Sequence, residues 1–230
     1  MTAFVLVPGA WLGGWAWKKV VPLLEERGHE AQTVTLTGMG ERVHLASKDV
    51  GIETAVQDVQ NVIKYNDLDG FVLVGHSFAG KVAAAVADRA PEKVRMVLYL
   101  DAFRPQKVRT PQGSFDPSEF PSDGWTIPLT EDILDSIGKD VQGADREWMR
   151  SKATPWPMKH VTDSVTLSEN FDSLKSAYIL CTGGGDDVEE ILKENLDGPV
   201  RVIESGHWPM ITKPDELVED MLSLTGGSVT

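Results

Sequence analysis

Short apolar runs alternate with longer amphipathic stretches along most of this 230-residue chain. An apolar run of about four to seven residues suits a strand buried on both faces, and amphipathic spacing suits a helix. This alternation predicts an α/β fold whose mostly parallel, doubly wound sheet is covered by helices on both faces. The expected strands are 4–7, 31–36, 71–74, 94–100, 177–182 and 200–203, and the expected helices are 15–27, 54–65, 79–89, 188–195 and 214–224.

The alternation is interrupted between residues 102 and about 175. This stretch is rich in Pro, Gly, Ser and Asp, contains Trp125, Trp148 and Trp156, and has helical spacing near 130–137 and 144–153. It is too long for a plain loop and too short for a second core. We therefore expect one domain over residues 1–230, with a cap or lid inserted at about 102–175.

Charge and composition narrow the possible partners. Lys and Arg number 22 against 35 Asp and Glu, which gives a formal net charge of −13. Such a surface repels phosphate backbones and anionic membranes, so neither nucleic acid nor a membrane is an expected partner. No apolar run approaches the length of about 18 residues that a membrane span needs. We expect a cytoplasmic protein, and a homodimer stays open.

The single cysteine, Cys181, lies in the apolar run 177–181 and is expected to be a small buried residue. One cysteine allows no intrachain disulfide. No cysteine spacing typical of a metal site occurs, and neither a metal nor another cofactor is expected.

The strongest motif is Gly75-His76-Ser77-Phe78-Ala79-Gly80. It stands between an expected strand and an expected helix, where a sharp turn can expose a nucleophilic serine above a sheet. Phe78 would open the helix, so its unpaired N–H would point to the same place as the Ser77 hydroxyl. An ordinary strand–helix turn with a serine at the helix cap could look similar, so the interpretation depends on a base for Ser77.

His207 is the expected base. A serine is a weak nucleophile until a base takes its proton. Of the five histidines, His207 stands just beyond the last expected strand and before the last expected helix. The carboxyl ends of parallel strands share one edge of the sheet, so His207 should lie near Ser77.

Residues 5–17, Val-Leu-Val-Pro-Gly-Ala-Trp-Leu-Gly-Gly-Trp-Ala-Trp, resemble the first strand and oxyanion loop of the plant methylesterase and hydroxynitrile lyase branch of α/β-hydrolases. The serine motif, residues 99–103 and Gly206-His207 are similar to that branch too, and residues 35–42 resemble its bacterial esterase-like members. The resemblance implies the α/β-hydrolase fold and an oxyanion hole made by the N–H groups of Ala10 and Phe78. Pro8 stands where relatives usually have histidine, and it supplies neither donor.

The same resemblance separates esterase from lyase. Lyases of this branch carry a threonine in the oxyanion strand and a lysine directly after the catalytic histidine, whereas this chain has Gly9 and Trp208 there. Both differences imply hydrolysis. Gly9, Trp11 and Trp208 are the expected substrate-binding residues, with Trp208 forming an apolar wall.

Two positions compete for the acid that orients His207. Plant relatives hold it after the strand 177–182, where this chain reads Gly183-Gly184-Gly185-Asp186-Asp187; Asp186 has the spacing of a helix cap. Asp101 ends the strand that follows the serine helix, and this resembles the acid of haloalkane dehalogenases and zearalenone lactonases. We favour Asp101, with Arg104 as its alternative partner.

The predicted function is that of a serine hydrolase of the carboxylesterase type. A Ser77–His207–Asp101 triad would hydrolyse a small apolar ester or lactone through an acyl-enzyme, without a cofactor. A hydroxynitrile-lyase-like enzyme on the same triad and a non-catalytic ligand receptor on a hydrolase scaffold are the alternatives.

Overall fold

A computed structural model of the protein describes residues 1–102, 122–185, 188–193 and 196–226. Its centre is a six-stranded sheet in the order β2-β1-β3-β4-β7-β8, in which all neighbouring strands pair in parallel. The strands are β1 (Ala3–Val7), β2 (Glu30–Thr33), β3 (Phe71–His76), β4 (Val94–Leu100), β7 (Ser176–Gly183) and β8 (Val200–Gly206). The predicted parallel α/β sheet is confirmed.

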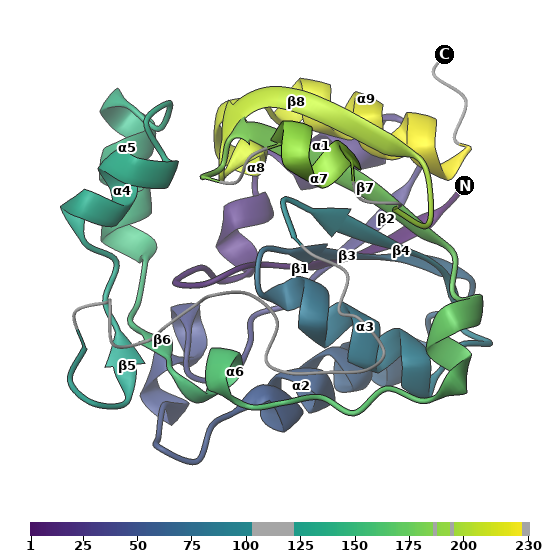
Figure 1. Ribbon diagram of the computed structural model, residues 1–230, viewed down its shortest axis with the longest axis horizontal. Helices are drawn as coiled ribbons and strands as arrows, with labels where there is room; N and C mark the ends of the chain where they lie inside the picture. The colour runs from purple at the N-terminus through teal and green to yellow at the C-terminus, as the bar shows by residue number, and fades with distance from the viewer. Residues whose placement is uncertain (103–121, 186–187, 194–195, 227–230) are drawn as a thin grey trace.

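Helices cover both faces of this sheet (Figure 1). On one face lie α1 (Val20–Glu26), α7 (Val188–Lys193), α8 (Pro209–Thr212) and α9 (Pro214–Thr225), and on the other lie α2 (Ile52–Tyr65) and α3 (Ala79–Arg89). Short 3-10 helices are η1 (Gly14–Trp17), η2 (Gly40–Leu45) and η4 (Glu169–Ser173). The two helical layers explain why the side chains of β1 from Phe4 to Val7 are fully buried.

The edge strand β2 departs from expectation. It ends at Thr33 rather than near residue 36, and it is only partly buried. A strand at the edge of a sheet has a neighbour on one side alone, so the apolar pattern that marks central strands is weaker there.

The strand order changes direction between β1 and β3. From β1 the chain moves outward to β2, then returns to β3 on the other side of β1 and continues toward β8. At such a switch point the loops after the two strands part and leave a crevice beyond their carboxyl ends. The loop that begins at Pro8 and the turn at Ser77 flank this point.

Between β4 and β7 the described residues 122–175, here called the inserted segment, lie outside the sheet (Figure 1). The helices α4 and α5 occur where the sequence indicates them. The elements are β5 (Thr126–Ile127), α4 (Glu131–Ile137), α5 (Gly143–Lys152), β6 (Trp156–Pro157) and α6 (Lys159–Thr162), with β5 and β6 forming an antiparallel pair.

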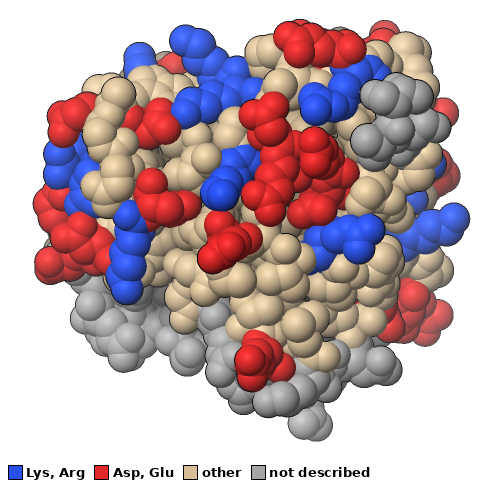
Figure 2. Space-filling view, turned by 90° about the horizontal axis from the view of Figure 1, so that it is seen from above, with Lys and Arg blue, Asp and Glu red and all other residues tan. Residues whose placement is uncertain are grey.

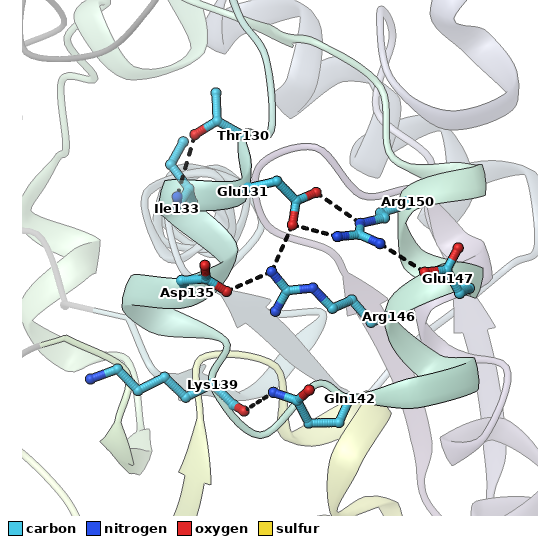
Figure 3. Close-up of polar contacts among 9 residues, drawn as sticks. All are labelled: Thr130, Glu131, Ile133, Asp135, Lys139, Gln142, Arg146, Glu147 and Arg150. Atoms are coloured by element: carbon cyan, nitrogen blue, oxygen red, sulfur yellow. Dashed lines mark hydrogen bonds and ion pairs between the residues drawn. The ribbon is translucent and has the colours of Figure 1, made fainter.

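Ion pairs join the two longer helices of the inserted segment (Figure 3). Glu131 of α4 accepts hydrogen bonds from Arg150 at 2.5 Å and Arg146 at 2.7 Å, both on α5. These two guanidinium groups hold the pKa of Glu131 at about 2. Arg146 also binds Asp135 at 2.6 Å. These ion pairs at the surface therefore link helices α4 and α5 to each other.

Figure 2 shows acidic and basic side chains mixed over one face of the molecule, with acidic groups gathered near its middle. Cys181 is buried and unpaired, as expected. In the described ranges, no helix is long and apolar enough to cross a membrane.

Candidate active site

Ser77 occupies a strained turn directly after β3. Its φ is +57°, a left-handed conformation that non-glycine residues rarely adopt. Its N–H donates to the carbonyl of Leu100 at 3.1 Å, which fixes the turn. Gly75 is needed because a Cβ there would lie 2.6 Å from the carbonyl oxygen of Ala79. The sequence thus builds a tight strand–turn–helix unit with the serine at its apex.

Two more residues at neighbouring strand ends share this strain. Trp11, four residues after β1, has φ +65°, and Asp101, directly after β4, has φ +43°. Among the described residues, Asp67 is the only other non-glycine residue with positive φ. Such conformations cost about 1–3 kcal/mol each and gather at functional sites. Their position after β1, β3 and β4 marks one edge of the sheet as the candidate site.

The Asp101 carboxylate contacts His207. His207 Nδ1 lies 2.5 Å from Asp101 Oδ2, and Asp101 Oδ1 accepts the N–H of Cys181 at 2.9 Å. Both residues are nearly buried, each with 9% of its surface exposed. An ionised carboxylate only accepts hydrogen bonds, so Nδ1 carries the proton and the lone pair is on Nε2. This is the tautomer that a general base needs.

Gly184 makes room for that carboxylate. A Cβ at Gly184 would overlap the Asp101 carboxyl group. The glycine run that stands where plant relatives are expected to carry the acid therefore has a physical purpose here: it leaves space for an acid that comes from β4. The competing candidate Asp186, its neighbour Asp187 and the alternative partner Arg104 lie outside the described residues.

His76, fully buried beside Ser77, links two parts of the site. Its Nδ1 accepts the Gly9 N–H at 3.1 Å, so its Nε2–H donates to the His207 carbonyl at 2.7 Å. The rings of His76 and His207 are 4.7 Å apart. Burial, and to a lesser degree His207, hold the pKa of His76 well below its usual value. A neutral imidazole thus joins the end of β1 to the loop after β8.

The N–H groups of Ala10 and Phe78 are available as oxyanion donors. In the part of the chain that the structure describes, neither donates a hydrogen bond to another group. Ala10 follows β1 and Phe78 follows Ser77, so both flank the switch point. Gly9, directly before Ala10, packs closely against the turn: a Cβ there would be 2.6 Å from His76 Nδ1 and 2.9 Å from Ser77 Cβ.

The two expected tryptophans are placed differently. Trp11 donates its indole N–H to the Ile127 carbonyl at 2.9 Å, and its own carbonyl accepts the Thr154 N–H at 3.0 Å. The inserted segment is therefore hydrogen bonded to the loop that carries Ala10. Trp208 is fully buried, edge-on to His207 at 5.7 Å, and a Cβ at Gly138 would overlap its ring.

Sequence reasoning missed Asp140, which lies between α4 and α5. Its Oδ2 accepts the Gly206 N–H at 2.8 Å and the Thr212 hydroxyl at 2.7 Å. Next to it, the Ile137 carbonyl accepts the His207 N–H at 2.8 Å. The inserted segment thus holds the loop of the base as well. In the sequence Asp140 stands two residues after Gly138, and nothing in the local pattern distinguishes it from an exposed aspartate.

A serine after β3, an acid after β4 and a histidine after β8, on a parallel sheet with this strand order, form the arrangement of an α/β hydrolase. A model of the alpha/beta hydrolase family matches residues 4–220, and the chain belongs to that family. This confirms the fold expected from the sequence motifs.

Curated relatives carry esterase names. The carbendazim hydrolyzing esterase of Nocardioides sp. (strain SG-4G) is 31% identical over 97% of this chain and 100% of its own length. Methylesterase 8 of Arabidopsis thaliana is 35% identical over 96% of this chain and 88% of its own length. A solved extracellular α/β-hydrolase from a Paenibacillus species superposes with a TM-score of 0.80 at 22% identity, covering 97% of this chain and 99% of that one. The expected class, a hydrolase of carboxylic esters, is confirmed.

Acid should destabilise the protein through His76. Unfolded histidine titrates near pH 6.5, whereas folded His76 resists protonation. Above pH 6.5 the histidine is neutral in both states, and its contribution to the free energy of unfolding is fully present. Below pH 6.5 the unfolded state takes up a proton that folded His76 does not, so the free energy of unfolding falls by at most about 1.4 kcal/mol per pH unit. His76→Gln can keep both hydrogen bonds without titrating. Its Tm should fall less than that of wild type between pH 7 and 5, and parallel Tm curves would contradict the assignment.

Asp140→Ala should slow turnover of p-nitrophenyl acetate about tenfold, mainly in kcat, because the Gly206 N–H loses its acceptor and the loop of His207 loosens. Asp140→Asn offers an amide oxygen to the same donors and should keep most of the activity. Thr212→Val removes one of the two bonds and serves as the matched control. Equal loss in the Ala and Asn variants would show that the charge, and not the hydrogen bonds, matters.

Proposed function

We propose that this chain hydrolyses small apolar carboxylic esters, lactones included, with Ser77 as nucleophile, His207 as general base and Asp101 as the residue that orients it. The observation that carries the proposal is the 2.5 Å contact between His207 Nδ1 and Asp101, made beside the strained turn of Ser77. The esterase names of the relatives support the same chemistry.

The reaction runs in two halves. Ser77 Oγ attacks the ester carbonyl while His207 Nε2 takes its proton, and the resulting oxyanion accepts hydrogen bonds from the N–H groups of Ala10 and Phe78. The histidine then returns the proton to the leaving alcohol, which leaves an acyl-enzyme. Water then attacks the acyl carbonyl while His207 Nε2 takes a proton from it. When the bond between the acyl carbon and Ser77 Oγ breaks, His207 returns that proton to Ser77 Oγ, and the acid leaves. No step calls on a metal or an organic cofactor.

The oxyanion donors supply much of the rate. Removing one such donor typically costs about 3 kcal/mol in activation free energy. The N–H groups here belong to rigid parts of the fold, since Phe78 opens α3 and Ala10 precedes the anchored Trp11. They need no reorganisation when charge develops, which is the source of their effect.

The substrate would bind at the switch point, with Gly9 permitting close approach to Ser77 and Trp11 presenting an apolar surface. We propose that residues 102–175 act as a cap over this place within a single domain of residues 1–230. Trp208 is fully buried and so cannot form the expected apolar wall; it would act by packing against His207. A cytoplasmic location is part of the same proposal, and a homodimer stays open.

Ser77→Ala should abolish ester hydrolysis while the fold stays intact, because the hydroxyl stands at the apex of the turn. The measurement is a panel of p-nitrophenyl esters, methyl esters, lactones and carbendazim, with labelling by a fluorophosphonate probe. His207→Ala should lose a similar factor, and the double variant little more, since the residues act as a unit. Turnover of Ser77→Ala within tenfold of wild type would refute the proposal.

Asp101→Asn should lower kcat by several orders of magnitude, because an amide favours the wrong tautomer of His207; about 10⁴ is the precedent in a serine protease. Asp186→Asn is the matched control at the competing position, and should cost little because asparagine also caps a helix. The opposite ranking of the two variants would move the acid to the loop after β7.

A further inference from the structure

The chain that follows β2 is buried although it forms neither a helix nor a strand. Residues 34–40 all lie in the interior, and η2 begins only at Gly40. Loops usually run over the surface, because a buried loop must find partners within the protein for its backbone N–H and carbonyl groups. The contacts of residues 35–42, here called the post-β2 segment, therefore need an explanation, and the mechanism above does not use them.

Asp58 of α2 anchors the post-β2 segment. One of its carboxylate oxygens accepts the Thr37 N–H at 2.6 Å, and the other accepts the Thr37 hydroxyl at 3.0 Å and lies 2.9 Å from the Arg42 guanidinium. Arg42 also donates to the Thr37 hydroxyl at 2.7 Å and to the Thr35 carbonyl at 3.2 Å. The Asp58 side chain is only 7% exposed, and a buried carboxylate needs such a partner. The ion pair thus fixes the segment along its length.

The fixed segment in turn contacts residues 9–14, here called the oxyanion loop. Gly14 of this loop donates its N–H to the Thr35 hydroxyl oxygen at 2.7 Å. Gly13 lies against Gly40 with no side chain between them, since a Cβ at Gly40 would be 3.0 Å from Gly13 Cα. The post-β2 segment therefore holds the far end of the oxyanion loop.

Thr154 of the inserted segment joins the same two parts of the chain. Its hydroxyl oxygen accepts the Gly40 N–H at 2.9 Å, while its own N–H donates to the Trp11 carbonyl at 3.0 Å. Trp11 directly follows Ala10, the candidate oxyanion donor of this loop. A displacement of the post-β2 segment would therefore reach the Ala10 N–H from two sides, through Gly14 and through Thr154.

We propose that Arg42 is a positioning residue for the oxyanion hole. Paired with Asp58, it fixes the post-β2 segment, and through that segment it keeps the Ala10 N–H where charge develops on the substrate carbonyl. The inference rests on the proposed ester hydrolysis at Ser77. It deepens that function by assigning a role in oxyanion stabilisation to an ion pair that touches neither the substrate nor the triad.

The test compares p-nitrophenyl acetate with its thionoester, in which sulfur replaces the carbonyl oxygen. Sulfur is a weak hydrogen-bond acceptor, so well-placed oxyanion donors favour the oxygen ester. Each kcat/KM is divided by the rate constant for alkaline hydrolysis of that ester, which removes intrinsic reactivity. Wild type should prefer the oxygen ester by about tenfold or more.

Arg42→Met removes the guanidinium hydrogen bonds and keeps a long apolar side chain. Its kcat for the oxygen ester should fall about tenfold, which is part of the loss expected for a whole oxyanion donor, while KM stays nearly unchanged. The thionoester should lose less, so the oxygen-to-sulfur preference should fall toward one. Arg42→Lys keeps a cation beside Asp58 and should recover part of the preference.

Thr35→Val tests the same chain of contacts nearer to the oxyanion loop. It removes the acceptor of the Gly14 N–H without leaving a buried charge unpaired, and it should lower the preference in the same way. Thr35→Ser keeps the hydroxyl and should retain the preference. If Arg42→Met does not fold, the Thr35 pair of variants decides the question.

Arg89→Met is the matched control. Arg89 forms an ion pair with Glu53 in the first turn of α2, through hydrogen bonds of 2.6 and 2.7 Å, and in the described ranges neither residue hydrogen bonds the post-β2 segment. Its preference should match wild type. A preference that is absent in wild type, unchanged in Arg42→Met or Thr35→Val, or equally lowered in Arg89→Met would overturn the inference while leaving ester hydrolysis intact. Loss of wild-type activity on p-nitrophenyl acetate itself would instead refute the proposed function.

Discussion

The imidazole of His76 hydrogen bonds in two directions, to the Gly9 N–H at 3.1 Å and to the His207 carbonyl at 2.7 Å. Those bonds tie the end of β1, which carries one candidate oxyanion donor, to the loop after β8, which carries the candidate base. They require a neutral ring of one tautomer, and complete burial ensures that state. The spacing between donor and base therefore depends on a side chain that touches no substrate.

The inserted segment adds a second level of control over the same two loops. Its Ile127 and Thr154 hold Trp11, and its Ile137 and Asp140 hold the loop of His207. The left-handed conformation of Trp11 is unfavourable by itself and persists because these contacts over-determine it. The inserted segment, which we expect to shape the substrate site, thus also supports the geometry of the reacting groups.

Much of this arrangement could be predicted from the sequence, for physical reasons that differ between elements. The central strands and the helices α2 and α3 follow from local periodicity. Ser77 follows from a motif whose shape is local too. The choice of Asp101 needed a comparison of two strand ends, and the space left by Gly184 could have favoured it. Asp140 could not be found, because its importance arises only when the turn between α4 and α5 packs against the residues around His207.

Gly9 has a consequence for the evolutionary history of this scaffold. The threonine that lyases of the resembling branch carry at this position would need space that His76 and Ser77 already fill, at 2.6 Å and 2.9 Å from the first added carbon. A threonine at position 9 would therefore force the His76 ring or the Ser77 turn to shift. Any path toward that chemistry must first shift the histidine or the turn, so the order of mutations is constrained. The effect of a side chain at position 9 would thus depend on which residues occupy positions 76 and 77.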